Sequence, residues 1–174
     1  MKFSKVMALA GVTLLASGVL AACSGSGSSA KGEKTFSYVY ETDPDSLNYL
    51  TTGKAAVANI TSNVVDGLME NDRYGNFVPS MAEDWSVSQD GLTYTYTIRK
   101  DAKWYTSEGE EYAPVKAQDF VTGLKYAADN KSEALYLVQE SIKGLDAYVK
   151  GEVKDFSEVG IKAIDDQTVQ YTLN

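Results

Sequence analysis

A strictly alternating segment in the middle of the chain constrains its fold most. Residues 93–99 alternate threonine with tyrosine or isoleucine, which places one set of side chains in a core and the other in water if the segment is a β-strand. Residues 85–88 alternate as well, and the intervening Gln-Asp-Gly at 89–91 is typical of a hairpin turn. The sequence therefore predicts an antiparallel hairpin. Its expected core residues are Trp85, Tyr94, Tyr96 and Ile98.

Apolar residues at helical spacing predict two amphipathic helices. The first covers residues 55–69 and ends at Gly67 or shortly beyond it, and the second covers residues 117–128. Asp119, near the start of the second helix, complements its dipole. Residues 133–149 hold one or two further helical turns. The two apolar stripes are Ala56, Val57, Ile60, Val64 and Leu68, then Ala117, Phe120, Val121, Leu124 and Ala128.

The remaining segments predict strands and turns. Residues 35–40 are aromatic and β-branched, which favours a strand, and Asp-Pro-Asp-Ser at 43–46 interrupts it. Residues 71–76 predict a turn. Residues 159–173 predict a second alternating hairpin around Asp165-Asp166-Gln167. The fold class expected from these segments is mixed α/β. Since the chain stops inside the last predicted strand, we expect it to be a fragment.

Composition excludes several classes of function. The net charge is −8, and removal of residues 1–22, which carry two lysines and no acid, makes it −10; nucleic acids and anionic lipids call for clustered basic residues instead. The chain has no histidine and no P-loop motif, so a Ser-His-Asp triad and His-containing zinc sites are absent. We expect no enzyme activity, no cofactor, no metal site and no nucleic-acid partner. The acids at 43–45, 108–111 and 165–166 are interpreted as solvated surface groups.

The N-terminus has the layout of a secretory signal. Residues 1–22 begin with two lysines and continue with an apolar run of about 15 residues, shorter than the roughly 20 that span a membrane. Leu-Ala-Ala at 20–22 followed by Cys23, the sole cysteine, resembles the lipobox of bacterial lipoproteins. That resemblance implies a lipidated Cys23, with several acyl chains for stable anchoring. The alternative is an ordinary signal peptide with a chance cysteine.

A flexible tether follows the cysteine. Residues 23–33 are rich in glycine and serine, a composition that behaves as a flexible linker. The expected organisation is a signal peptide at 1–22, a lipidated tether at 23–33 and a globular part at 34–174. This places the protein on the extracellular face of a bacterial cell membrane, held by its lipid anchor.

Residues 78–99 closely resemble the signature of the oligopeptide-binding extracellular solute-binding proteins of family 5, which serve ABC importers. The resemblance continues through residues 103–104, 114–120 and 159–166 and covers about 35–173; with the lipobox and the acidic surface it resembles the streptococcal type. Two departures are visible. Lys116 stands where relatives often have Thr or Ser before the helix, and the loop at 105–113 is longer and more acidic.

The resemblance implies a periplasmic-binding-protein-like class II fold with two lobes, of which residues 34–174 are part of the N-terminal lobe. It implies a monomeric receptor that binds an oligopeptide ligand and delivers it to the permease subunits of an ABC transporter. In the family the peptide backbone pairs with strand-like segments of the lobes, as in β-augmentation. The matching loop here follows the turn at 47–49. Its expected peptide-binding residues are Thr51, Thr52, Gly53, Lys54 and Ala55.

Other interpretations remain open at this point. Gly53 would let two backbones approach closely, but the loop could equally be a plain connection to a helix. The protein could be a peptide-sensing or adhesive surface lipoprotein that does not feed transport. An extracellular hydrolase lacks nucleophile-base pairs in this stretch, and the absence of histidine argues against relatives that carry metals.

Overall fold

The computed structural model describes residues 37, 39 and 42–174. The chain divides into two units, Met1–Val39 and Tyr40–Asn174, and all elements below belong to the second. The predicted signal peptide, Cys23 and the tether lie outside the described residues. So does the predicted strand at 35–40, apart from Ser37 and Val39, which are not in a strand.

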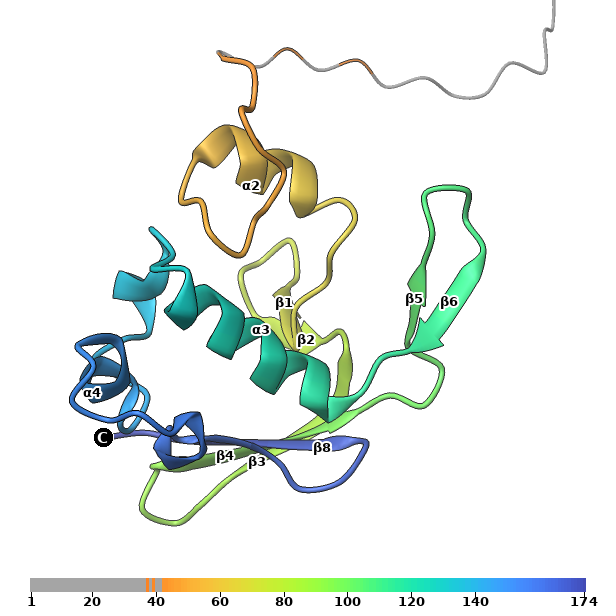
Figure 1. Ribbon diagram of the computed structural model, residues 1–174. Coiled ribbons are helices and arrows are strands. Elements are labelled where there is room, and N and C mark those ends of the chain that lie inside the picture. The colour runs from red at the N-terminus through yellow and green to blue at the C-terminus, as the bar shows by residue number, and fades with distance from the viewer. Residues whose placement is uncertain (1–36, 38, 40–41) are drawn as a thin grey trace, which may run out of the picture. The chain divides into compact units, whose positions relative to one another are not determined.

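A four-stranded antiparallel sheet forms the centre of this unit (Figure 1). It contains β3 (Ala82–Val87), β4 (Thr93–Ile98), β7 (Ile161–Ala163) and β8 (Thr168–Thr172) in the order β3-β4-β8-β7. The predicted hairpin at 85–99 is confirmed: Trp85 pairs with Tyr96, and Gly91 takes the left-handed conformation with φ 75° in its turn. The second predicted hairpin is confirmed as β7 and β8.

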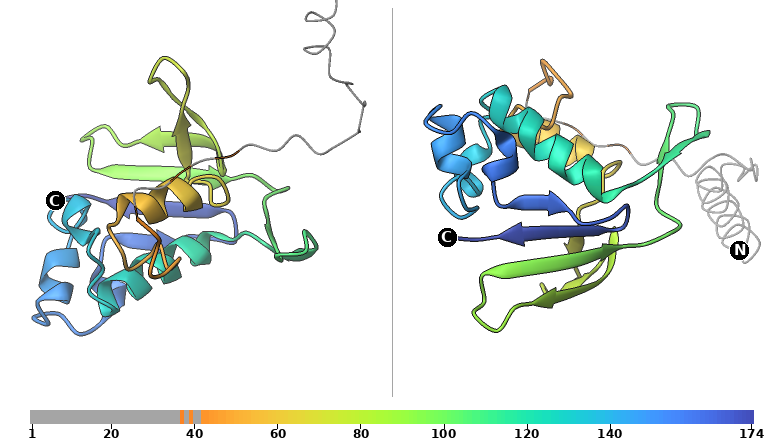
Figure 2. Two further views of the ribbon diagram at one scale, coloured as in Figure 1. Left: turned by 90° about the horizontal axis from the view of Figure 1, so that it is seen from above. Right: turned by 60° about the horizontal axis from the view of Figure 1, so that its bottom comes forward.

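Helix α3 (Ala117–Asp129) lies over one face of the sheet (Figures 1 and 2). Its predicted apolar stripe is confirmed, because Ala117 and Ala128 are buried and the other three residues pack against the core. The short helix α4 (Leu145–Val149) and the 3-10 turns η1 (Leu135–Leu137) and η2 (Phe156–Glu158) occupy the segment between α3 and β7. Residues of the hydrophobic core that are fully buried are Ile98, Ala117, Leu145, Val159 and Val169.

Two small hairpins complete the unit. The first joins β1 (Met69–Asn71) to β2 (Phe77–Pro79) through the predicted turn, in which Asp72 accepts hydrogen bonds from the amides of Tyr74 and Asn76. The second joins β5 (Lys103–Tyr105) to β6 (Glu111–Pro114) and holds most of the acidic loop at 105–113. None of the helices in the described part of the chain has both the length and the apolar character that crossing a membrane requires.

The first predicted helix is much shorter than expected. Helix α2 covers only Ala55–Thr61, and Val64, expected on its apolar face, is 77% exposed. Residues 62–64 form a turn that closes the helix, with the amide of Val64 donating to the carbonyl of Thr61 at 3.0 Å. The carbonyls of Gly67 and Leu68 instead accept hydrogen bonds from the amides of Met81 and Ala82. Tertiary pairing therefore overrides the helical spacing.

The predicted core face of the first hairpin is correct for Ile98 and wrong for Trp85. Ile98 is fully buried and Tyr96 packs against the core, but Trp85 is 37% exposed. Trp85 lies on the edge strand β3, so it has a neighbouring strand on one side only. The threonines of β4, predicted to be wet, are half-buried, and Thr95 accepts a hydrogen bond from Gln170 on β8.

Asp119 caps α3 in place of the missing Ser or Thr. Its Oδ2 accepts the backbone amide of Lys116 at 3.0 Å and the indole Nε1–H of Trp104 at 2.8 Å. The amide of Ala117 donates to the carbonyl of Asp166, and the Lys116 ammonium pairs with the Asp166 carboxylate at 2.7 Å. The helix start is thus held by β5 and by the β7–β8 turn rather than by an N-cap hydroxyl.

Candidate functional site

The predicted peptide-binding loop leads directly into α2. Thr51 and Thr52 are half-buried, and Gly53, Lys54 and Ala55 are exposed. Ala55 is the first residue of the helix, and Lys54 precedes it in an extended conformation with φ −72° and ψ 127°. The five residues are therefore contiguous and accessible, as a ligand-contacting loop requires. Their role in binding stays a prediction.

A residue that the sequence analysis did not single out holds this loop. The Glu133 carboxylate accepts the amide of Gly53 at 2.9 Å and the hydroxyl of Thr52 at 3.4 Å. The amide of Glu133 in turn donates to the carbonyl of Thr51 at 3.0 Å. No local pattern could have identified Glu133, because it lies 80 residues from Gly53 in the chain.

Asn48 makes a second link between this region and α3. Its side-chain amide donates to the hydroxyl of Tyr126 at 3.1 Å, and its carbonyl accepts the amides of Thr51 and Thr52. Tyr126 belongs to the last turns of α3. Hydrogen bonds therefore link the loop region both to Tyr126 near the end of α3 and to Glu133, which follows that helix.

An exposed ion pair lies beside the loop. The Lys54 ammonium and the Asp45 carboxylate are 2.5 Å apart. The hydrogen bond to Asp45 raises the pKa of Lys54, and the same contact lowers the pKa of Asp45. Solvent-exposed pairs contribute little to stability, so this pair orients Lys54 more than it stabilises the fold.

The backbone donors of the loop are already used within the chain. The amides of Thr51 and Thr52 donate to Asn48, that of Gly53 to Glu133, and that of Lys54 to the Thr52 hydroxyl at 3.2 Å. Within the described residues, no hydrogen bond reaches the carbonyl oxygens of Thr52 and Gly53. Within the described part of the chain, the loop therefore has free backbone acceptors and no free backbone donor among Thr51, Thr52, Gly53 and Lys54.

The chain itself does not require a glycine at position 53. A Cβ atom there would meet the Cβ of Glu133 at 3.4 Å, which is ordinary contact. The close approach of a second backbone at Gly53 stays a prediction from the sequence.

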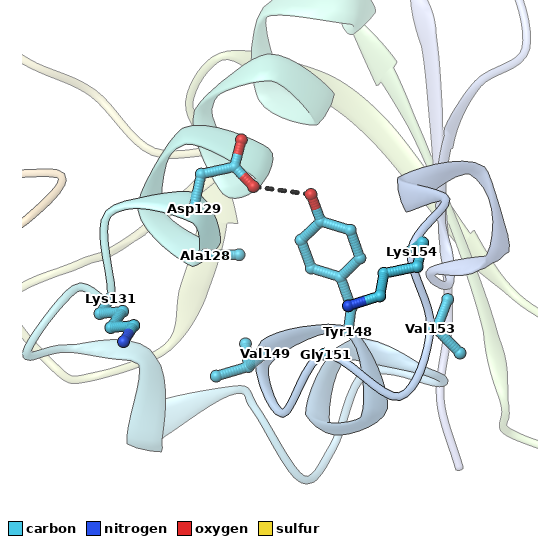
Figure 3. A pocket seen from close by; sticks show the side chains of 8 residues that line it. All are labelled: Ala128, Asp129, Lys131, Tyr148, Val149, Gly151, Val153 and Lys154. Carbon is cyan, nitrogen blue, oxygen red and sulfur yellow. Dashed lines mark hydrogen bonds between the residues drawn. The ribbon is translucent and has the colours of Figure 1, made fainter.

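A shallow hollow of about 240 Å³ lies between the end of α3 and α4 (Figure 3). The Tyr148 hydroxyl donates to Asp129 at 2.6 Å, and the Lys125 ammonium pairs with the same carboxylate at 2.5 Å. The bond to Asp129 is the main cause that raises the pKa of Tyr148. Within this hollow the Tyr148 hydroxyl and the Asp129 carboxylate are therefore engaged with each other and with Lys125.

The acids predicted to be solvated surface groups are exposed. One of them, Asp165, also accepts hydrogen bonds within a turn. Asp165 accepts the amides of Gln167 and Thr168 at 2.8 and 2.7 Å, and the first of these bonds is the main cause that lowers its pKa. Across the described residues, no three acids, cysteines or histidines converge to hold a metal ion.

Residues 76–174 match the family described as bacterial extracellular solute-binding proteins, family 5. The oligopeptide-binding protein AliA of Streptococcus pneumoniae is 88% identical over the whole chain, which covers 26% of that protein. The oligopeptide-binding protein SarA of Streptococcus gordonii is 70% identical over the whole chain, which covers 27% of it. The chain thus spans about a quarter of the length of these curated relatives.

Solved structures share the fold. The chain is 32% identical to OppA of Listeria monocytogenes bound to peptide, with a TM-score of 0.66 over 74% of this chain and 25% of that one. The murein tripeptide binding protein MppA of Escherichia coli is 27% identical, with a TM-score of 0.65 over 75% of this chain and 25% of that one. These similarities confirm the expected fold class, of which this chain provides one part.

Proposed function

The chain belongs to family 5 of the bacterial extracellular solute-binding proteins, and from this we propose that it is the N-terminal part of a receptor for oligopeptides. The observation that carries the proposal is the 88% identity over the whole chain with a protein named as oligopeptide-binding. In this proposal the receptor captures peptides outside the cell and delivers them to the permease of an ABC transporter. It acts by binding and has no catalytic role.

The loop at 51–55 is our proposed contribution of this chain to the peptide site. Two features support it: the residues are accessible, and the carbonyls of Thr52 and Gly53 have no hydrogen bond from a described residue. A peptide in extended conformation offers backbone amide donors for such free carbonyl acceptors. We further propose that residues 34–174 form part of the N-terminal lobe of a two-lobed receptor, with the second lobe closing over the peptide.

Titration calorimetry with the whole receptor tests the site. We expect the wild type to bind a pool of tri- to hexapeptides, and Gly53→Ala to bind it more weakly while melting at the same temperature, because an added methyl group fits the chain but obstructs a neighbouring peptide backbone. Gly123→Ala is the matched control, since a Cβ there meets no atom within 4 Å. Unchanged affinity of the Gly53 variant would place the peptide elsewhere.

Transport is tested in cells. A strain that lacks the gene should fail to grow on these peptides as its only amino-acid source and should recover with the wild-type gene. Normal growth of the deletion strain would favour a sensing or adhesive role instead.

We also propose that Cys23 carries the membrane anchor, after cleavage of residues 1–22, and that residues 23–33 are its tether. The sole cysteine between a small-residue pair and a Gly/Ser tract supports this. Cys23→Ala should release the protein from the membrane fraction or leave it unprocessed. Unchanged fractionation of this variant would exclude the anchor.

A further inference from the structure

Glu133 stands on a rigid part of the fold. Its neighbour Ser132 is 7% exposed, donates its amide to the carbonyl of Ala127 at 2.9 Å and accepts the amide of Ala134 on its hydroxyl at 3.2 Å. Leu135, two residues further on, is a buried member of the hydrophobic core. The backbone of Glu133 is therefore fixed from both sides, whereas its side chain is free to reach outward.

The loop has no such support from apolar packing. None of its residues 51–55 belongs to the described core, and all five are half-buried or exposed. Its position depends on hydrogen bonds, and those to Glu133 come from across the fold rather than from neighbouring residues. A loop that is held by hydrogen bonds to a distant residue, without apolar packing, should become more mobile when that residue's side chain is removed.

We propose that Glu133 is the positioning residue of the peptide-binding loop, an inference that rests on the proposed function. Its carboxylate accepts a hydrogen bond from the Gly53 amide at 2.9 Å, and its own amide donates one to the Thr51 carbonyl at 3.0 Å. These two bonds flank Thr52, so they fix the course of the backbone on both sides of it. The carbonyls of Thr52 and Gly53 are thereby held ready before a peptide arrives, which lowers the ordering cost of binding.

The hydrogen bond to Gly53, rather than the negative charge, is the feature that matters. A glutamine at 133 keeps an oxygen acceptor at the same distance from the backbone, whereas an alanine removes it. The two substitutions therefore separate positioning from electrostatics. Glu110→Ala is a suitable control, because Glu110 is an exposed acid in the β5–β6 loop.

The experiment compares Glu133→Ala, Glu133→Gln and Glu110→Ala in the whole receptor. Peptide affinity is measured by calorimetry with the tri- to hexapeptide pool, and deuterium exchange is measured by mass spectrometry on fragments that cover residues 50–56. A net hydrogen bond changes an equilibrium by roughly twofold to tenfold. We expect Glu133→Ala to weaken binding by about that factor and to speed exchange in the loop, with Glu133→Gln and Glu110→Ala close to wild type.

Three results would overturn the inference. Glu133→Ala could leave loop exchange unchanged, which would show that the Glu133 carboxylate does not hold the loop. It could speed exchange without weakening binding, which would show that the loop does not position the peptide. Glu133→Gln could bind the peptides as weakly as Glu133→Ala does, which would show that the negative charge, and not the hydrogen bond, supports binding. If the wild type itself bound no peptide, the proposed function would fail, and the exchange data would still show whether Glu133 holds the loop.

Discussion

At the scale of single residues, Tyr171 shows what burial does to a titratable group. It packs edge-on against Tyr96, with ring centroids 6.0 Å apart and an interplanar angle of 88°. Burial raises the pKa of Tyr171 to about 12, because the phenolate would lose its hydration. The protonated ring is therefore part of the packing between β8 and β4.

Stability should fall as the pH rises from 10 toward 12. The folded state keeps the Tyr171 proton more tightly than the unfolded chain, whose tyrosine pKa is about 10, so the contribution is complete below pH 10 and is lost above it. The loss from this residue is about 2 to 3 kcal/mol. Urea unfolding between pH 9 and 12 should show that the free energy of unfolding declines more steeply for the wild type than for Tyr171→Phe. Parallel declines in the two proteins would contradict this prediction.

Two glycines should respond to alanine with opposite signs. A Cβ at Gly160 would lie 2.3 Å from the carbonyl oxygen of Thr172, so Gly160→Ala should destabilise by about 1–3 kcal/mol or more. Gly123 lies inside α3 with no atom within 4 Å of an added Cβ, so Gly123→Ala should stabilise by about 0.5–1 kcal/mol. Thermal melting of both variants checks this, and shifts of the same sign would be inconsistent with it.

At the scale of elements, the Asp119 side chain makes two of the contacts that hold the start of α3. Asp119 accepts hydrogen bonds from the amide of Lys116 and from the indole of Trp104 on β5. The carboxylate also lies in the first turn of the helix, where the macrodipole favours a negative charge. One residue thus joins the helix to the neighbouring hairpin.

Replacing Asp119 by alanine should lower the free energy of unfolding by about 1–2 kcal/mol, because the loss of the capping carboxylate leaves the Lys116 amide without this acceptor. Asp119→Asn keeps an oxygen acceptor and should therefore lose less stability than Asp119→Ala. Gln118→Ala is the control, since the Gln118 side chain makes only a 3.5 Å contact with Thr122. Urea unfolding of the three variants measures the difference. Equal losses for Asp119→Ala and Gln118→Ala would show that the cap is unimportant.

At the scale of the whole molecule, the chain spans about a quarter of its curated relatives. In our proposal it provides one part of a peptide site, and the remainder of the contacts and the exclusion of water come from the second lobe. Affinity multiplies across contacts, with about tenfold for each 1.4 kcal/mol. A chain that provides only part of the contacts should therefore bind peptides weakly.

These 174 residues alone should bind peptides only in the millimolar range or more weakly, against micromolar binding by the whole receptor. Calorimetric titration of the isolated chain without residues 1–22, beside the whole receptor, makes the comparison with the same peptide pool. Micromolar binding by the isolated chain would mean that this part holds a complete site.

The sequence by itself determined the parts of the fold that depend on neighbouring residues. The alternation at 93–98 and the Asp-Gly turn define the β3–β4 hairpin, and the spacing of Phe120, Val121 and Leu124 defines the buried face of α3. These patterns can be read locally because a strand repeats every two residues and a helix every 3.6. The lipobox at Cys23 and the loop at 51–55 were also suggested by sequence, and they remain predictions.

Only the tertiary structure decided the features that depend on distant contacts. Helix α2 ends at Thr61 because the following segment pairs with β2 and with the start of β3. Trp85 is partly exposed because its strand is at the edge of the sheet. The bond between Glu133 and Gly53 joins residues 80 positions apart, and no local periodicity encodes such a contact. These groups are brought together by the packing of elements that are distant in the sequence.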